Sequence, residues 1–248
     1  MAFTVHAVMP GVWHIVDCMG VCMTLLEGEN AAMLVDTGYG IEDVADFMRH
    51  MTDLPLTVFL THNHHDHAMG ARCFPETYML EADMADWRMF TDDKMRRRVL
   101  TQAIGKNLPV DEKTFLAGEI PLPKVMKPGV IDLGGLTAEI IEAPGHTPGS
   151  AVVYVPERKL LLSGDDWNPC TWLFFPQALG LREYRSNMRG IQQLPFEKVL
   201  CPHREALYDR WMFDDFFNAL TDGNLRAAEP VNIAPYEPVS YTHLTLPT

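Results

Sequence analysis

Apolar and polar residues alternate along the first part of the chain as they do in short β-strands. The stretches TVHAV, GVWHIVD and VCMTLLE, which fall within residues 4–27, have the period of two that turns one face of a strand toward a core. The turn-forming sequences MPG and GEN stand around them. The apolar run AAMLVDTG, residues 31–38, is typical of a buried strand. This part of the chain is therefore predicted to contain four strands.

Helical patterns then appear between further strands. IEDVADFMRHM, residues 41–51, is predicted as a helix, and LTVFLTH, residues 56–62, as a strand. Residues 81–104 have a helical pattern. Residues 105–129 are predicted as a loop, because four prolines oppose regular structure there. These prolines are Pro109, Pro121, Pro123 and Pro128.

Three strand candidates follow that loop, LTAEIIEAPG, SAVVYV and KLLLSGDD, and the turn PERK joins the last two. A helix over residues 182–193, the strand EKVLCPH and an amphipathic helix over residues 205–220 complete the predicted elements. Strands in runs with helices between them indicate an α/β or α+β layered sandwich. No break in the pattern marks a second domain, so residues 1–238 are predicted to form a single one.

Composition and charge narrow the classes of partner. The 248 residues include 33 acidic and 20 basic ones, for a net charge of −13, so the average surface repels nucleic acid and anionic membranes. The chain has no apolar stretch of about twenty residues, and its N-terminus lacks a basic segment followed by an apolar run, so we expect neither a membrane span nor a signal peptide. The five cysteines are odd in number and scattered, as in proteins whose thiols stay reduced. We therefore expect a cytoplasmic protein with a small-molecule substrate, and its oligomeric state is left open.

The segment VSYTHLTLPT, residues 239–248, carries no charged side chain and fits no periodic pattern. It resembles the in-frame translation of a transposon-end adaptor from a sequencing library. We expect it to be an artefact that packs loosely, with the natural C-terminus cut short and His243 of no functional meaning.

Four histidines and an aspartate lie within six consecutive positions of THNHHDHAMG, residues 61–70. A solvated loop is the plain alternative to a metal site here. On a helix, His62 and His64 point about 200° apart and cannot share an ion. In an extended segment His62, His64 and Asp66 lie on one side, and His67 comes round from the following turn. Imidazole and carboxylate ligands suit zinc and neighbouring metals, so a metal site on a strand end or loop is predicted. The helical His-Glu-x-x-His arrangement is excluded.

Six consecutive residues cannot easily supply every ligand of a tetrahedral ion. The chain offers three further candidates: His146 in APGHTPGS, Asp165 in LLLSGDDW and His203 in VLCPHRE. Each follows an apolar strand at the point where the chain turns, which is where α/β folds place their chemistry. The glycines near His146 let the backbone bend close to an ion.

This ordered set of residues resembles the full ligand set of the metallo-β-lactamase superfamily of hydrolases. The match runs over residues 62–203, and the flanking strand pattern extends it over most of the chain. The resemblance implies an αβ/βα four-layer sandwich, in which two mixed β-sheets face each other and helices lie on the outside. It also implies two metal ions, the first held by His62, His64 and His146, the second by Asp66, His67 and His203, with Asp165 bridging both.

Elementary chemistry supports that assignment. Two divalent ions close together repel each other, and Asp66 and Asp165, the predicted catalytic residues, supply negative charge that offsets this repulsion. A water bridging both ions would have a pKa of roughly 7 or below, which gives a hydroxide nucleophile at neutral pH. We expect two Zn²⁺ per chain, with Fe or Mn as alternatives, and a hydrolase that attacks an acyl or phosphoryl group.

This sequence differs from several known branches of the superfamily, and these differences reduce the number of reactions that it is expected to catalyse. Asp165 stands where the commonest secreted β-lactamases of this fold have a cysteine, and His64 stands where the oxygen-reducing di-iron branch has a glutamate. Glyoxalase-II-type thioesterases append a basic helical domain, whereas only about thirty-five residues separate His203 from the suspected artefact. The acidic chain also lacks the basic surface of the RNA-processing branch. We predict hydrolysis of a small, hydrophobic ester, thioester or lactone. The alternatives are a phosphodiesterase and a metal-binding protein whose hydrolysis is incidental.

An aromatic cluster follows the bridging aspartate in WNPCTWLFFP, residues 167–176. Part of it belongs in a core, but its position predicts a pocket wall for a hydrophobic acyl group. The predicted pocket residues are Trp167, Trp172, Phe174 and Phe175. Residues 81–129 are long enough to form a lid. Three arginines share one face of the helix predicted after this cluster, as a solvated face or a carboxylate clamp. They are Arg182, Arg185 and Arg189.

Three residues near the predicted ligands are expected to support the site without binding metal. His65 points away from the ions, Asp166 lies in an outer position, and Asp36 stabilises the surrounding structure. Cys201, two residues before His203, is expected to pack in the core.

Overall fold

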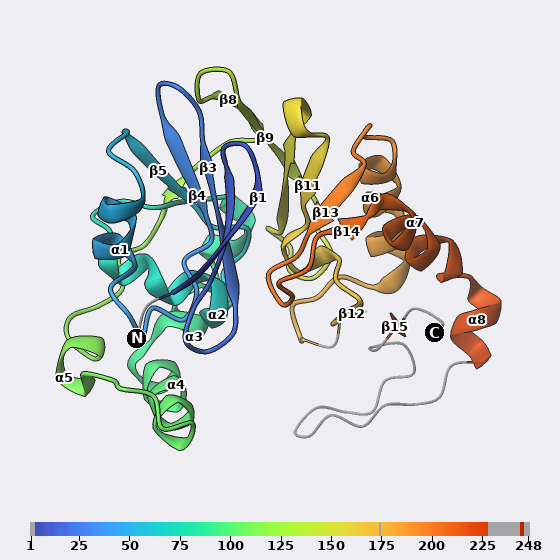
Figure 1. The fold of residues 1–248 in the computed structure, drawn as a ribbon. Helices are drawn as coiled ribbons and strands as arrows, with labels where there is room; N and C mark the ends of the chain where they lie inside the picture. The colour runs from blue at the N-terminus through green and yellow to red at the C-terminus, as the bar shows by residue number, and fades with distance from the viewer. Residues whose placement is uncertain (1–2, 174, 228–243, 246–248) are drawn as a thin grey trace.

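The computed structural model describes residues 3–173, 175–227 and 244–245, and two β-sheets that face each other dominate it (Figure 1). The first sheet contains, in spatial order, β1 (Thr4–Met9), β2 (Val12–Val16), β3 (Cys22–Glu27), β4 (Ala32–Val35), β5 (Leu56–Phe59), β6 (Tyr78–Met79) and β7 (Lys124–Val125). The second contains β14 (Tyr208–Asp209), β13 (Lys198–Leu200), β11 (Leu160–Leu162), β10 (Ala151–Val155), β9 (Thr137–Glu142) and β8 (Gly129–Asp132). Both sheets are mixed, because β4 to β7 pair in parallel in the first sheet and β11 pairs in parallel with β13 in the second.

Helices lie outside the two sheets and at one end of them. They are α1 (Val44–Met51), α2 (His65–Ala68), α3 (Trp87–Thr91), α4 (Asp93–Gly105), α5 (Glu112–Phe115), α6 (Leu181–Gln192), α7 (Arg210–Ala219) and α8 (Asp222–Ala227). Helix α1 begins at Asp43, whose carboxylate accepts the backbone N–H of Asp46, and its buried face packs on the first sheet. Helices α6 and α7 pack on the second sheet from the other side (Figure 1).

The burial of β10 shows why the molecule has four layers. Its residues are all buried, but Ala151, Val153 and Val155 belong to the core between the two sheets, whereas Val152 and Tyr154 belong to the core beneath α6 and α7. Successive side chains of a strand point to opposite faces, so a strand buried on both faces must lie between two packed layers. The predicted four-layer arrangement of two mixed sheets with outer helices is confirmed.

Several predicted elements have different bounds in the structure. Residues 81–104 are not one helix but a 3₁₀ turn followed by α3 and α4, and Asp92, between these helices, caps α4 by accepting the N–H of Met95. The predicted loop 105–129 contains α5 and β7 and ends in β8. The last amphipathic helix begins at Arg210 rather than Glu205, because residues 208–209 pair with β13 instead.

The suspected artefact lies almost entirely outside the described residues. Of residues 239–248, the structure describes Leu244–Thr245, which form β15 and pair antiparallel with β12 (Cys170–Thr171). This pairing concerns two backbone positions, so the expectation of loose packing for the whole segment stays a prediction. The adaptor origin of the segment stays a prediction.

Candidate metal centre

All seven predicted ligands lie where the chain leaves a strand, at one end of the two sheets. The first cluster follows β5, His146 follows β9, Asp165 lies in a 3₁₀ turn after β11, and His203 follows β13. Both sheets therefore contribute side chains to one place, as the sequence predicts for an α/β layered fold.

The first cluster is extended only as far as His64. His64 has extended backbone angles and is the N-cap of α2, and its carbonyl accepts the N–H groups of His67 and Ala68. Asp66 therefore lies in a helical turn, and the prediction of a continuous extended segment through Asp66 is wrong. This change from strand end to helix directs His62 and His64 to one part of the site and Asp66 and His67 to another, which a straight segment would not achieve.

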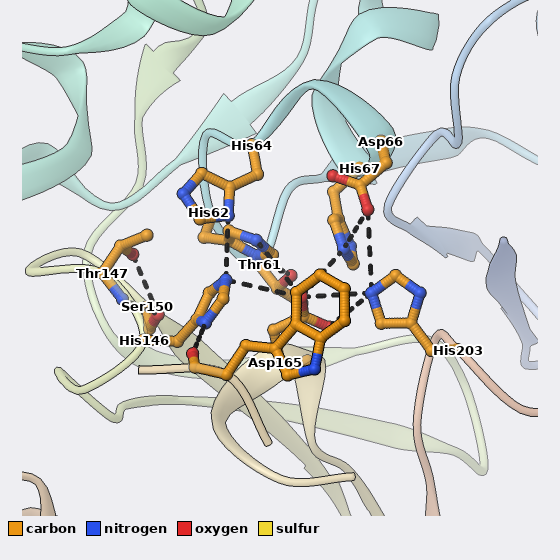
Figure 2. Close-up of polar contacts among 12 residues, drawn as sticks. Thr61, His62, His64, Asp66, His67, His146, Thr147, Ser150, Asp165 and His203 are labelled. Atoms are coloured by element: carbon orange, nitrogen blue, oxygen red, sulfur yellow. Dashed lines mark hydrogen bonds and ion pairs between the residues drawn. The ribbon is translucent and has the colours of Figure 1, made fainter. Parts of the chain in front are cut away.

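The candidate ligand atoms form two groups, and within each group they lie within 4.8 Å of one another. The first group is His62, His64, His146 and Asp165, and the second is Asp66, His67 and His203. Figure 2 shows Asp165 between the three histidines of the first group and the three residues of the second.

The Asp165 carboxylate contacts both groups. Its Oδ2 atom lies 3.4 Å from His146 Nε2 and 4.0 Å from His62 Nε2 on one side. On the other side it lies 3.5 Å from His67 Nε2 and 3.1 Å from His203 Nε2. One carboxylate thus reaches imidazole nitrogens of both groups, which is the geometry a bridging ligand needs.

Two nitrogens at the centre of the cluster fit a cation. His62 Nε2 and His67 Nε2 are buried and form no hydrogen bond with any described residue. A buried polar atom without a hydrogen-bond partner lowers the stability of the folded protein by about 1–3 kcal/mol, and such atoms are rare in native structures unless they bind an ion or water. Both nitrogens face neighbouring imidazoles and carboxylates, and imidazole with carboxylate is a donor set that suits zinc, so the residues present fit a metal ion.

Partners on the far side of each ring hold the imidazoles in place. His67 Nδ1–H donates to Asp36 Oδ2 at 3.0 Å, and His146 Nδ1–H donates to the backbone carbonyl of Trp172 at 2.6 Å. His62 Nδ1 lies 3.1 Å from the Thr61 hydroxyl. In each case the opposite nitrogen, Nε2, is left to face the cluster. Such outer partners fix the tautomer and orientation of a metal-binding histidine.

Asp36 stabilises the site without entering either group, as predicted. It follows β4 with φ of 64°, a left-handed conformation that Asp tolerates better than most residues. Its carboxylate accepts the backbone N–H of Thr61 at 2.7 Å and the Thr61 hydroxyl at 2.9 Å, in addition to the His67 ring. One buried carboxylate therefore connects β4 to both ends of the first cluster. Sequence reasoning missed Thr61.

Electrostatics differ between the two groups. Burial and neighbouring imidazoles lower the pKa of His62 and His64 well below the ordinary value, so these rings are neutral and have lone pairs available. Burial also lowers the pKa of His67, but Asp165 and Asp66 outweigh it and raise that pKa well above its ordinary value. The second group therefore favours a positive charge, which either a proton or a metal cation can provide.

Asp166 and His65, the two other residues predicted to lie near the ligands, differ in position: Asp166 is buried behind the site and His65 lines the cavity over it. Asp166 is buried behind His146 and accepts its backbone N–H at 2.9 Å, and burial raises the pKa of Asp166 well above its ordinary value. Tyr184 donates its hydroxyl to the backbone carbonyl of Asp166. His65 does not turn away to the surface, because it lines the cavity over the site, with its ring edge-on to Tyr39 at 5.5 Å.

A cavity of about 590 Å³ opens over the two groups, and we call it the site cavity. Trp172 and Phe175 line it, as predicted, and Phe174 lies outside the described residues. Trp167 does not line it: its side chain is fully buried in the core beneath α7 and packs against Phe213, so that part of the prediction is wrong.

The sequence gives no local signal for most of the cavity wall. Helices α3 and α4 and the loops after β2 and β4 supply residues far apart in the chain, so no motif joins them. The lining residues from these segments include Met19, Tyr39, Phe90, Met95, Arg98 and Gln102. Since α3 and α4 lie within residues 81–129, the segment predicted as a lid supplies one wall of the site cavity. The arginine clamp is not at the site: Arg185 pairs with Asp222, and Arg185 and Arg189 line a separate pocket against α7.

A buried aspartate that sequence reasoning missed fixes the loop around His146. Asp83 accepts the Thr147 hydroxyl at 2.7 Å, the Gly149 N–H at 2.6 Å and the Asn63 N–H at 3.1 Å. It therefore ties the first cluster to the loop of His146. A Cβ on Gly149 would lie 2.6 Å from the backbone nitrogen of Asp83, so this glycine serves close packing rather than approach to an ion.

Comparison with known proteins agrees with this fold and site. The model of the metallo-beta-lactamase superfamily matches residues 16–203, and the chain belongs to that superfamily and is a hydrolase. It is 26% identical over 202 residues to acyl-coenzyme A thioesterase MBLAC2 of Gallus gallus, a match that covers 72% of this chain and 70% of the relative.

Two solved structures show the same fold at low sequence identity. A metallo-beta-lactamase from Pontibacter korlensis superposes with a TM-score of 0.61 at 18% identity, covering 89% of this chain and 99% of that one. The inverting sec-alkylsulfatase Pisa1 from Pseudomonas sp. gives a TM-score of 0.66 at 14% identity, covering 91% of this chain and 43% of that one. Within the described part of the chain, no helix has the length and apolar character needed to span a membrane.

Proposed function

We propose that this protein is a dinuclear zinc hydrolase that cleaves a small thioester, ester or lactone with an apolar acyl group. The observation that carries the proposal is the central position of Asp165, whose carboxylate contacts imidazoles of both ligand groups. A single carboxylate shared by two groups of donors is suited to holding two cations side by side.

Each ligand group suits one ion. His62, His64 and His146 would hold the first ion through neutral imidazoles, and Asp66, His67 and His203 would hold the second with one carboxylate among them. The imidazole and carboxylate donors favour zinc, and iron and manganese accept the same donors. When bound, two such ions supply Lewis acidity, which polarises a scissile carbonyl and makes a water molecule more acidic.

The chain's own residues prepare the site for that chemistry. Asp36, Thr61 and the carbonyl of Trp172 orient the imidazoles before any substrate arrives, so little reorganisation is needed during the reaction. The rings of Phe90 and Phe175 pack 4.5 Å and 4.6 Å from the ring of His64 and exclude water from that side. An acyl group bound there would lie beside the two ligand groups.

The thioester is the preferred substrate class among the three. The thioesterase MBLAC2 from Gallus gallus supports this choice, because the match covers most of both chains. The site cavity, at about 590 Å³, is within the range of pockets that bind small organic ligands. All five cysteines are free thiols in the structure, which supports the proposal of a reducing, cytoplasmic location.

Metal analysis combined with turnover on matched substrates tests the proposal. The purified chain is loaded with zinc, its metal content is measured, and it is assayed on an aryl thioester, an aryl ester, a lactone and an aryl phosphodiester. We expect two zinc ions per chain and faster turnover of the thioester than of the phosphodiester. His146→Asn should bind fewer than two zinc ions per chain and lose turnover. His50 is an exposed histidine on α1, and His50→Asn should keep both the zinc content and the turnover of wild type.

Other outcomes would replace the proposal. Preferred cleavage of the phosphodiester would make the protein a phosphodiesterase of the same superfamily. Two bound ions with no turnover of any of the four substrates would leave a metal-binding protein.

A further inference from the structure

Two arginines line the site cavity without a carboxylate partner. Arg98 lies on α4, and Arg204 follows His203 directly. Neither guanidinium forms an ion pair with any residue that the structure describes; Arg204 Nη1 donates to the backbone carbonyl of His203 at 2.8 Å. The neighbours of Arg98 on the same helix behave differently, because Arg96 and Arg97 both pair with Asp93.

Unpaired cations are unexpected in so acidic a chain. Acidic residues outnumber basic ones by 33 to 20, and yet two arginines face this opening. The carboxylates of the cavity, Asp66 and Asp165, are engaged with imidazoles of the cluster. The two guanidinium groups are therefore available to an anion that enters from solvent.

The apolar part of the cavity lies over the first ligand group. The Phe90 and Phe175 rings pack against His64, and the Phe175 ring also lies 5.4 Å from that of His146. Trp172 lines the same side, since its backbone carbonyl accepts the His146 Nδ1–H.

The cationic part lies over the second ligand group. His65, beside Asp66, has its ring edge-on to Tyr39 at 5.5 Å, and both residues line the cavity together with Arg98. Arg204 is adjacent to His203, the last member of that group. The cavity therefore has an apolar half and a cationic half, with Asp165 between them.

We infer that the site cavity binds its substrate in one direction, with an apolar acyl group along Phe90, Phe175 and Trp172 and an oxyanion on the leaving group at Arg98 and Arg204. The inference rests on the proposed hydrolysis and names its substrate class, the acyl thioester or ester of an anionic thiol or alcohol. Carboxylate and phosphate share the chemistry that a guanidinium recognises. In the reaction, water adds its oxygen to the acyl carbon as the carbon–sulfur bond breaks, and the leaving thiolate keeps the bonding electron pair and takes up a proton.

Four thioesters of similar size test the direction of binding. Three are hexanoyl thioesters of thiophenol, of 4-mercaptobenzoate and of 4-mercaptophenyl phosphate, which have a neutral, a carboxylate and a phosphate leaving group. The fourth is the adipoyl monothioester of thiophenol, which places its carboxylate on the acyl end. With zinc-loaded protein we expect kcat/KM to be about tenfold higher for the anionic leaving groups than for the neutral one, and no gain for the adipoyl compound.

Arginine variants separate recognition from intrinsic reactivity, because a leaving group's own reactivity is the same with every variant. Arg98→Gln should reduce the preference for anionic over neutral leaving groups about tenfold, and Arg204→Gln should act in the same direction. Arg97→Gln is the matched control, since Arg97 is the next residue on α4, pairs with Asp93 at 2.7 Å and does not line the cavity. The preference should be unchanged in Arg97→Gln.

A binding measurement tests the anion site without requiring that the protein cleave any substrate. Calorimetry compares naphthalene-2-sulfonate with the uncharged 2-naphthyl methyl sulfone, and we expect tighter binding of the sulfonate in wild type but not in Arg98→Gln. If no thioester is cleaved but this difference is present, the proposed function fails and the anion site stands. Equal binding of the two probes, an undiminished preference in Arg98→Gln, or a preference for the adipoyl compound would overturn the inference.

Discussion

At the residue scale, the Asp165 carboxylate determines whether the seven candidate ligands act as one centre or as two separate groups. It is almost fully buried, and both its oxygen atoms lie 3.1 Å from His203 Nε2. Burial opposes its ionisation, but His203 and His67 hold its pKa well below the ordinary value. The side chain is therefore charged, and that charge is available to two cations at once.

Asp165→Asn removes one negative charge from the shared position and changes the shape of the side chain very little. We expect the variant to lose one metal ion preferentially and kcat to fall at least about a hundredfold, which corresponds to roughly 2.7 kcal/mol of barrier. Metal analysis and kinetics on the same preparation measure both effects. Two retained ions with near-normal turnover would show that Asp165 is not the bridge and would direct attention to Asp166.

Asp36 acts one step further from the ions. Asp36→Asn should weaken metal binding by about 10–100-fold, because the His67 ring loses the carboxylate that fixes its tautomer and orientation. A competition titration with a zinc chelator measures the change in affinity. Asp53→Asn, at an exposed position before β5, is the control, and equal zinc affinity in the two variants would contradict a positioning role for Asp36.

His14 gives a prediction about pH. It is buried on β2, where Nε2–H donates to the Arg204 carbonyl and Nδ1 accepts the Thr24 hydroxyl, and burial lowers its pKa below 6.5. The unfolded chain therefore binds more protons than the folded one below about pH 6.5, so the free energy of unfolding decreases as pH falls through that range. His14→Gln should show a smaller decrease than wild type in denaturant titrations at pH 7.5 and pH 5.5. Parallel decreases in the two proteins would exclude His14 as a cause.

At the element scale, Asp83 in the 3₁₀ turn Glu81–Met84 joins the segment between β5 and α2 to the loop that follows β9. Asp83→Ala leaves the N–H groups of Asn63 and Gly149 without their acceptor, and we expect a loss of about 1–3 kcal/mol in the free energy of unfolding. Because the His146 loop loosens, zinc affinity should fall as well. Glu81→Ala, exposed in the same turn, is the matched control, and chemical denaturation of the two variants with and without zinc distinguishes them.

The elements that could be predicted from the sequence are those whose own residues determine them. β2, β3 and β10 have side-chain patterns that reflect burial on one or both faces, and α1 and α6 have a clear helical period. β7 has two exposed residues and forms through backbone bonds from Lys124 to Thr77 and from Met126 to Met79, which leave no side-chain pattern. α2 has four residues, too few to show a period, so the turn at His64 was not predictable although the ligands were.

The ligands were predictable for a different reason than the cavity. Few residue types bind metal ions, and the ligands here follow the ends of strands. The ligand pattern can therefore be recognised in the sequence alone. A cavity wall requires only shape and polarity, which many residue types can supply. Arg98 and Phe90 come from helices whose packing over the site depends on the whole fold, and Trp167 and Trp172 differ in role although they are five positions apart.

At the scale of the whole molecule, the candidate metal centre connects the two sheets. His62 and His64 leave the first sheet after β5, whereas Asp165 and His203 leave the second after β11 and β13. Ions held by both sets of ligands would join the sheets at this end, where buried polar groups replace the apolar core found elsewhere between them. Because an apolar core also packs the two sheets together away from this end, we expect the fold to persist without metal but with lower stability.

Removing the metal therefore gives the last prediction. A ligand present at about a thousand times its dissociation constant stabilises the folded state by about 4 kcal/mol. For a domain of this size, each 1 kcal/mol changes Tm by roughly 2–4 °C, so a strong chelator should lower Tm by roughly 8–16 °C. Circular dichroism before and after chelation should show unchanged secondary structure at 25 °C, and added zinc should restore Tm. Because His146→Asn removes a ligand of the first group, its Tm should respond less to the chelator than that of wild type. A chelator-independent Tm in zinc-loaded wild type would mean that the ligands do not join the two sheets through bound ions.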